Sequence, residues 1–331
     1  MSAAMRTITG RSLTVGALIV VGLALVVVPL KVHLSNYILT LMVMLLIHIM
    51  LSESWNLMAG YAGQVNLGMA AYFGTGSLCY TLAYVKVGAP MYVAFVVAGL
   101  AATALACIIG PPTLRLRGAY FGIGTMALAE VVRLVATTTF ALPIYPPASY
   151  WATFTLTKSY YVALAVAMAT IAVAYGVTHS RLGMALQAMR DDEDAANASG
   201  INPAKYKMIV FMISSFLAGV TGAVFAFHRG NPNIPAQFTM DWTIGAIVSV
   251  TIGGWGTLTG PVLGSTVFVI LKEILGRTFP TAYLVVTGII FIVVVVFLPD
   301  GLVSIGAVIR RFFAPRVRRP TASLSEHMDA P

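Results

Sequence analysis

The sequence predicts an all-α, polytopic helical membrane protein with about ten transmembrane helices. Of its 331 residues, 59% are hydrophobic and only 9% are charged, whereas soluble domains contain about 25% charged residues. The apolar residues form repeated long runs, and roughly 20 consecutive apolar residues suffice for a helix to cross a bilayer. A transmembrane β-barrel would instead show alternating segments of about ten residues. These observations exclude an ordinary soluble enzyme.

Ten apolar runs are expected to form the spans. In chain order they are 13–30, 37–58, 67–87, 91–110, 118–138, 160–179, 208–228, 243–260, 261–276 and 283–299. Arg6 and Arg11 precede the first run, as basic residues precede the apolar part of a signal peptide. That run ends without a small-residue cleavage site, so we expect an uncleaved first helix. The runs at 243–260 and 261–276 are short and rich in glycine.

The distribution of basic residues predicts the orientation. With ten spans, the N-terminus, the 111–117 loop, the 180–207 loop and the C-terminal tail share one side. Thirteen of the 20 Lys and Arg residues lie on that side and five on the other, with Arg133 and Lys272 inside spans. Because cytoplasmic loops carry the excess of Lys and Arg, both termini are predicted to be cytoplasmic. The net charge of +9 follows this pattern of topology signals, so no nucleic-acid partner is expected.

The chain is therefore divided into three parts. Residues 1–12 form a cytoplasmic N-terminus, and residues 13–305 form the transmembrane domain, with 180–207 as a cytoplasmic loop. Residues 306–331 form a basic, disordered cytoplasmic tail. The arginines of the tail serve as a topology anchor or touch anionic membrane lipid.

Two segments, 56–68 and 253–264, interrupt the apolar pattern with glycine and polar residues. In lipid, irregular backbone survives only where protein or a watery cavity surrounds it, and interrupted helices in corresponding positions indicate a transport pathway. The alternative is that the glycines only let helices pack closely or turn. The pathway candidates from these segments are Asn56, Gly60, Gln64, Asn66, Gly253 and Gly254.

Few ionisable residues lie within the predicted spans: Glu53, Glu130, Arg133, Lys272 and Glu273. Each is expected to face protein or water, because charges inside membranes are costly. Glu130 and Arg133 are spaced i,i+3 and can neutralise each other on one helical face. They are either a structural pair or further elements of the pathway. A proton-coupled transporter would need an acidic relay, for which Glu130 is the suitable residue.

Motifs for nucleotide, metal or redox chemistry are missing from the sequence. It has no Gly-x-x-x-x-Gly-Lys-Ser/Thr loop for ATP and no His-Glu-x-x-His for zinc. Cys79 and Cys107 lie in apolar runs without motif spacing. We therefore expect this chain to bind no cofactor or metal and not to be an enzyme. A membrane enzyme would need clustered Asp or His at the surface, and only 191–194 offers such a cluster.

The 180–207 loop is the long polar island of the chain. It holds eight of the 31 charged residues in 28 positions. Residues 183–198 favour a helix, Gly200 should end it, and Pro203 should prevent its restart. A short helix with apolar residues among charges suits insertion into a partner's groove. The alternative is a solvated connecting loop.

This loop also carries a family resemblance. Residues 194–200, Asp-Ala-Ala-Asn-Ala-Ser-Gly, resemble the Glu-Ala-Ala-x-x-x-Gly loop of ABC importer permeases, with Asp194 in place of Glu. The surroundings resemble branched-chain amino acid permeases of the LivM type. The supporting stretches, in family order, are 56–64, 114–120, 130–134, 200–202 with 206–207, 253–264 and 299–302. The chain departs from the family pattern at Met69, at 140–147 and at Asp300.

The resemblance implies a multi-subunit importer in the bacterial inner membrane. The expected partners are a LivH-like second permease, two cytoplasmic ATPases similar to LivG and LivF that hold ATP and Mg, and a periplasmic binding protein. The implied cargo is branched-chain or related amino acids, although the altered 140–147 loop puts the cargo in question. The residues implied in coupling to the ATPases are Met189, Arg190, Asp194, Ala195, Ala196 and Gly200. The alternative function is an ion-coupled secondary transporter of small organic solutes.

Overall fold

The computed structural model describes residues 35–140, 154–230 and 233–278, together with positions 285, 288, 289, 292 and 301–303. Within these residues the chain is helical and contains no strand. Several predictions fall outside the described residues: the termini 1–12 and 306–331, the span 13–30, nearly all of the span 283–299, residues 141–147 and Asp300.

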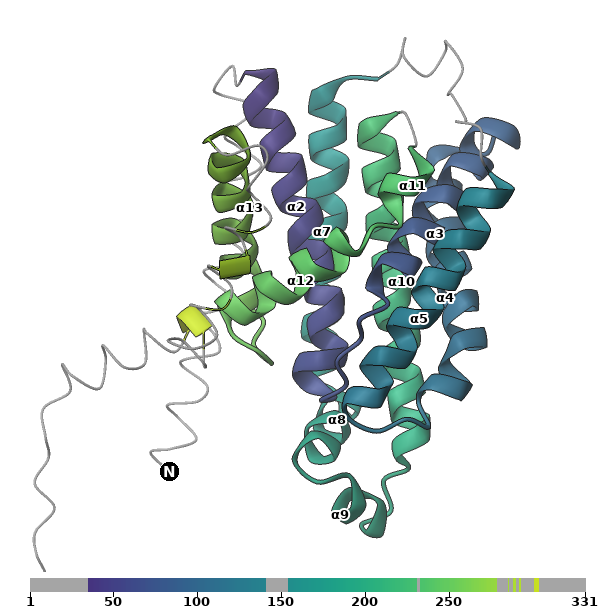
Figure 1. Cartoon of the computed structure of the whole chain (residues 1–331), viewed down its shortest axis with the longest axis vertical. Coiled ribbons are helices and arrows are strands. Elements are labelled where there is room, and N and C mark those ends of the chain that lie inside the picture. Colours follow the sequence, from purple (N-terminus) through teal and green to yellow (C-terminus); the bar gives the residue numbers. More distant parts are fainter. Residues whose placement is uncertain are drawn as a thin grey trace, which may run out of the picture.

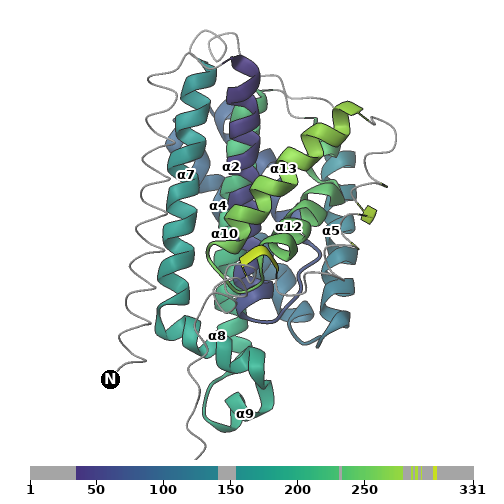
Figure 2. The same cartoon turned by 90° about the vertical axis from the view of Figure 1, so that its left-hand side faces the viewer.

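Five helices of the described chain are long and apolar enough to cross a membrane. They are α2 (Asn36–Asn56) with its π-helical continuation η1 (Leu57–Tyr61), α4 (Met91–Thr113), α5 (Ala119–Thr139), α7 (Leu156–Thr178) and α10 (Pro203–Arg229). In Figures 1 and 2, α2, α7 and α10 lie side by side along the long axis. These helices correspond to five of the predicted spans and establish a multi-pass helical protein.

Three other predicted spans are helical but do not qualify as full crossings. They correspond to α3 (Met69–Thr81) with η2 (Leu82–Lys86), α12 (Met240–Gly253) and α13 (Gly260–Thr278). At about 1.5 Å per residue, the 14 residues of α12 extend roughly 21 Å, shorter than the ~30 Å bilayer core. The predicted run 243–260 stops at Gly253 because Gly254 leaves the helix with φ 129°. The structure therefore does not confirm ten transmembrane helices.

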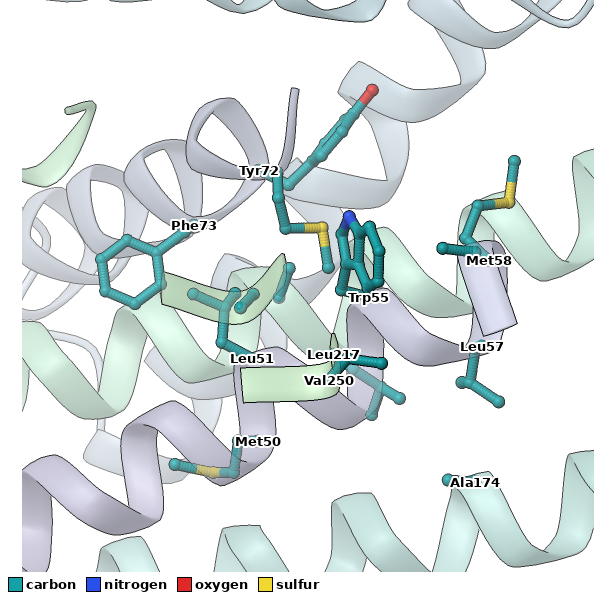
Figure 3. Packing of buried hydrophobic residues seen from close by; sticks show 14 of the residues in the cluster. Met50, Leu51, Trp55, Leu57, Met58, Tyr72, Phe73, Ala174, Leu217 and Val250 are labelled. Atoms are coloured by element: carbon teal, nitrogen blue, oxygen red, sulfur yellow. The ribbon is translucent and has the colours of Figure 1, made fainter. Parts of the chain in front are cut away.

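The core surrounds the second half of α2. Its buried side chains meet residues of α3, α7, α10 and α12. Figure 3 shows this cluster, with Met50, Leu51, Trp55, Leu57, Met58, Tyr72, Phe73, Ala174, Leu217 and Val250 labelled. Helices α3 and α10 approach at backbone distance, since a Cβ on Gly222 would lie 1.9 Å from the carbonyl oxygen of Phe73. Small residues at such crossings allow helices to pack closely within membranes.

The polar loop forms a separate lobe at one end of the molecule, below the ends of α2, α7 and α10 (Figures 1 and 2). It contains two helices, α8 (Arg181–Asp191) and α9 (Glu193–Ala198), and not the single predicted helix. Asp192 separates them because it leaves helical geometry (φ −154°) and caps α9: its carboxylate accepts from the Asp194 and Ala195 amides at 2.9 Å each. Such a capping carboxylate satisfies amides that have no partner within the helix.

The structure differs from the prediction for Pro203, where the chain leaves the lobe. Gly200 does follow the end of α9, with φ 88°. Pro203, however, does not prevent a new helix, because it is the first residue of α10. The side chain of Asn202 caps this helix: its Oδ1 accepts a hydrogen bond from the Lys205 backbone amide at 3.1 Å. Proline is well suited to this position because the first helical amide needs no partner and its φ is already helical.

Candidate functional site

The two glycine-rich interruptions lie against each other although they are about 200 positions apart in the chain. The Asn56 Nδ2 donates to the Thr257 carbonyl oxygen at 2.9 Å, and the Gly256 amide donates to Asn56 Oδ1 at 3.0 Å. Trp55 and Trp255 flank this contact edge to face, with ring centroids 5.2 Å apart. We call residues 55–64 and 253–260 the glycine junction.

Close backbone contact in the junction requires glycine at position 60. A Cβ on Gly60 would lie 2.0 Å from Asn56 Oδ1 and 2.6 Å from the Gly256 amide nitrogen. The same stretch is π-helical, through η1, and π-helical turns are frequent at functional sites. The close approach confirms that this glycine lets two backbone segments pack together, while the assignment of Gly60 to a transport pathway stays a prediction.

Arg190, in the last turn of α8, extends from the polar lobe into the junction. Its Nη1 donates to the carbonyl oxygen of Gly60. A Cβ on Gly256 would lie 2.7 Å from the same Nη1, and one on Gly63 would lie 3.3 Å from Arg190 Cγ. A single side chain thus contacts both interruptions and ties the lobe to them.

The remaining polar residues of the first interruption stabilise its non-helical turn. Asn66 is fully buried; its Oδ1 accepts from the Gly68 amide at 2.8 Å and its carbonyl oxygen accepts from Trp55 Nε1 at 2.7 Å. Gln64 is also buried, and its backbone amide donates to the Met58 carbonyl oxygen at 3.1 Å. Side-chain and backbone groups therefore replace the helical hydrogen bonds that this segment gives up.

The second interruption is a tight turn between α12 and α13. A Cβ on Gly253 would lie 1.8 Å from the Gly260 carbonyl oxygen, and Gly254 adopts φ 129°. The structure thus brings Asn56, Gly60, Gly253 and Gly254 to one place. Sequence reasoning did not single out Trp255, Gly256 and Thr257 as individual contacts, although they lay inside the predicted segment.

The lobe presents only part of the surface expected for coupling. Met189 and Ala196 are buried against this chain's own core, with 4% and 5% of their surface exposed. Their methyl groups are thus unavailable for the expected packing against a partner. Asp194, Ala195 and Gly200 are exposed, and Met184, which is 64% exposed, is the large apolar residue on this surface.

An ion pair fastens the lobe to α10. The Lys207 Nζ lies 2.7 Å from Glu193 Oε2, and only 3% of the Lys207 side chain is exposed. A second pair, Arg117 with Asp194 at 3.4 Å, is well exposed and contributes little to stability. It does place the 111–117 loop and the 180–207 loop at the same end, as the orientation argument requires.

Glu130 and Arg133 form the predicted i,i+3 pair on α5. The Arg133 Nε donates to both carboxylate oxygens of Glu130, at 2.9 and 2.8 Å. Each side chain remains partly exposed. Their side-chain hydrogen bonds are made to each other and not to the glycine junction.

The fold and the site define a class: a multi-pass helical membrane protein in which a polar loop at one end is tied to interrupted helices in the core. Comparison with known proteins identifies the group within this class. The chain belongs to the family described as "Branched-chain amino acid transport system / permease component", which matches residues 37–295.

Individual relatives agree with this assignment. The chain is 27% identical over 289 residues to the high-affinity branched-chain amino acid transport system permease protein LivM of Escherichia coli K12, covering 78% of this chain and 68% of the relative. It is 24% identical over 236 residues to a probable LivM of Methanocaldococcus jannaschii, covering 64% and 68%. LivH of Escherichia coli K12 is 26% identical over 140 residues, covering 41% and 44%. No solved structure matches the chain. The expected resemblance to LivM is confirmed.

Proposed function

We propose that this chain is a permease subunit of an ATP-driven importer in the bacterial inner membrane, and that it forms part of the pathway for branched-chain or related amino acids. Its family membership supports the role of permease. The names of its LivM relatives supply the class of cargo. A periplasmic binding protein would deliver the solute to the side opposite the polar lobe.

The chain would work beside a second, LivH-like permease and two ATPases similar to LivG and LivF. The similarity to both LivM and LivH supports a pair of related permeases. The sequence contains no P-loop, so ATP and Mg would be bound by the partner ATPases and no cofactor by this chain. Its cytoplasmic contact would be the exposed surface of α8 and α9.

The contact between Arg190 and Gly60 is the observation that carries the mechanism. An ATPase that moved α8 would displace Arg190, and Arg190 would transmit the movement to both interruptions at once. The Lys207–Glu193 pair would make α9 follow α10. Rigid displacement of packed helices is a common way to switch between two states of a protein, here inward-open and outward-open.

Reconstitution tests this function. The complete importer, with both permeases, both ATPases and the binding protein, is placed in proteoliposomes, and uptake of radiolabelled leucine is measured with and without ATP. Ala195→Arg places a long cation on the exposed face of α9 and should reduce ATP-driven uptake at least tenfold, while the subunit still inserts into the membrane. Lys158→Glu, at the exposed opposite end on α7, is the matched control and should transport normally.

Two results would overturn the proposal. One is leucine uptake by this chain alone under a proton or sodium gradient, which would indicate a secondary transporter. The other is normal ATP-driven uptake by the Ala195→Arg importer, which would remove the lobe from the coupling path.

A further inference from the structure

A cavity of about 600 Å³ lies in the half of the molecule away from the polar lobe. It is lined by residues of α2, α10, α12, α13 and the short helix α11 (Ile234–Gln237). Along α2 it extends from Tyr37, in the first turn, to His48, near the middle of the helix. The glycine junction lies at the other end of α2, around Asn56, so this cavity is a separate site.

Four charged residues line the cavity, and two of them, Asp241 and Lys272, are opposite charges that form no ion pair with each other. Asp241 lies in the first turn of α12 and Lys272 lies on α13. Within the described residues, neither side chain forms a hydrogen bond or an ion pair. The neighbouring Glu273, in contrast, accepts from Arg277 at 2.7 Å and from Tyr37 at 2.8 Å. Two unpaired charges on the walls of one cavity suit a ligand that carries both charges itself.

His48 adds an aromatic ring to the cavity wall. It is 3% exposed, and its Nδ1 is buried with no hydrogen-bond partner among the described residues. Its ring stacks on Trp242, with centroids 5.6 Å apart, and meets the edge of Phe268 at 5.2 Å. The Nδ1 is inaccessible to solvent and lies on the side of Gly245, so His48 contributes its ring face, and not this nitrogen, to the cavity wall.

The rest of the lining combines apolar side chains with hydroxyl groups and with two further charged residues, Glu273 and Arg229. Leu41 and Met44 of α2, Phe225 of α10 and Val269 of α13 form an aliphatic and aromatic wall. Arg229 also lines the cavity, with its guanidinium carbon 6.0 Å from the centre of the Phe225 ring. A mainly apolar pocket with a few placed polar groups is the usual architecture of a small-molecule site.

We propose that this cavity is a binding site for a zwitterionic amino acid with an aliphatic side chain. The ligand carboxylate is held by Lys272, its ammonium group by Asp241, and its side chain by the wall of Leu41, Met44 and Val269. The inference rests on the proposed function, which makes amino acids the cargo, and adds the place in this chain that holds them. The site gives the permease its own selection for zwitterions, independent of the binding protein.

The experiment measures ligand binding without the binding protein. The assembled importer in lipid nanodiscs is studied by saturation-transfer difference NMR with L-leucine as the probe, because this method detects weak binding. Asp241→Asn and Lys272→Met should each weaken leucine binding about tenfold or more, since hydrogen bonds to charged groups are among the strong ones. Lys158→Met, an exposed lysine outside the cavity, is the matched control and should bind as the wild type does.

Competing ligands and a variant with the two charges exchanged test whether both charges of the ligand are recognised. L-isoleucine should displace leucine, whereas 4-methylpentanoate, which lacks the ammonium group, and isopentylamine, which lacks the carboxylate, should not. The double variant D241K/K272D should recover binding lost in the single variants. Co-elution with the partner permease on size exclusion verifies that each variant is assembled.

The inference is overturned if wild-type importer gives no leucine signal, if Asp241→Asn and Lys272→Met bind like the wild type, or if 4-methylpentanoate displaces leucine as well as isoleucine does. ATP-driven uptake, measured in parallel, separates this result from the proposed function. Normal uptake with no charge-dependent binding rejects the cavity alone. Charge-dependent binding without ATP-driven uptake rejects the importer role alone.

Discussion

The guanidinium of Arg190 donates a hydrogen bond to the carbonyl oxygen of Gly60, 130 positions earlier in the chain. This bond joins the polar lobe to a π-helical turn at the end of α2. The same guanidinium lies against Gly256 of the turn between α12 and α13. A displacement of Arg190 would therefore break its contacts with both interruptions.

Removing this side chain should uncouple the lobe from the junction. Arg190→Ala is expected to lower ATP-driven uptake by about tenfold or more, because hydrogen bonds from charged groups contribute roughly 1.5–3 kcal/mol. The assembled importer should still hydrolyse ATP. The matched control is Arg181→Ala, the exposed arginine at the start of α8. Equal losses of uptake in both variants would contradict a specific role for Arg190.

A methyl group at position 60 should disrupt the junction itself. The Cβ of Gly60→Ala would collide with Asn56 Oδ1 and the Gly256 amide, and overpacking typically costs about 1–3 kcal/mol. We expect a lower melting temperature of the purified chain by fluorescence-detected size exclusion. Gly176→Ala on α7, where a Cβ meets nothing within 4 Å, should leave the melting temperature unchanged or slightly raised. A Gly60→Ala protein as stable as Gly176→Ala would show that the junction is looser than described.

The amide of Asn56 should not be replaceable by a carboxylate. In Asn56→Asp the donor to the Thr257 carbonyl oxygen is lost and an acceptor faces it, while the acceptor for the Gly256 amide remains. Leaving buried polar groups unpaired costs about 1–3 kcal/mol, so the melting temperature should fall. The exposed Asn197→Asp on α9 is the control. If Asn56→Asp and Asn197→Asp have the same melting temperature, the side chain of Asn56 does not hold the two interruptions together.

The ion pair between Glu193 and Lys207 should hold the lobe against α10. In Glu193→Gln the Lys207 ammonium stays buried without its carboxylate, although the Glu193 side chain is 28% exposed, so the cost should fall below the about 3–5 kcal/mol of a fully buried pair. Limited proteolysis of membrane vesicles should then cut the 180–207 segment faster. Arg117→Gln removes the partner from the exposed Arg117–Asp194 pair and should not change the cutting rate. Slow cutting of the Glu193→Gln protein would mean that α9 is held by other contacts.

The helical character of the 180–207 loop could be predicted from the sequence, but the division of the loop into two helices could not. Helix-forming residues, the glycine at 200 and the charge cluster predicted a helical polar loop, and the structure contains one. The sequence could not show that Asp192 would divide the helix, because a carboxylate in a helical run and a capping carboxylate look alike until the backbone turns. Pro203 was misjudged for the same reason: proline ends one helix or begins another depending on the backbone that precedes it.

The burial of two predicted coupling residues, Met189 and Ala196, also became visible only in the tertiary structure. Met189 and Ala196 fit an exposed docking face by spacing alone, but both are buried in the main core cluster of this chain, because α8 packs against η1, α7 and α10, and α9 packs against α10. The cavity illustrates the same limit. Asp241 and Lys272 are 31 positions apart in the chain, and nothing in their spacing indicates that they line one space.

Local sequence alone shows that this is a helical membrane protein, that it resembles LivM-type permeases, and, for most of the described helices, where each begins and ends to within about five residues. Those properties follow from local composition, since a bilayer selects long apolar helices regardless of what they later contact. The tertiary structure alone decided that segments 56–64 and 253–260 meet, that Arg190 joins them, and that two unpaired charges share a cavity. Such contacts depend on how helices cross and on which small residues let backbones approach, and these are relations between distant segments that no single stretch of sequence contains.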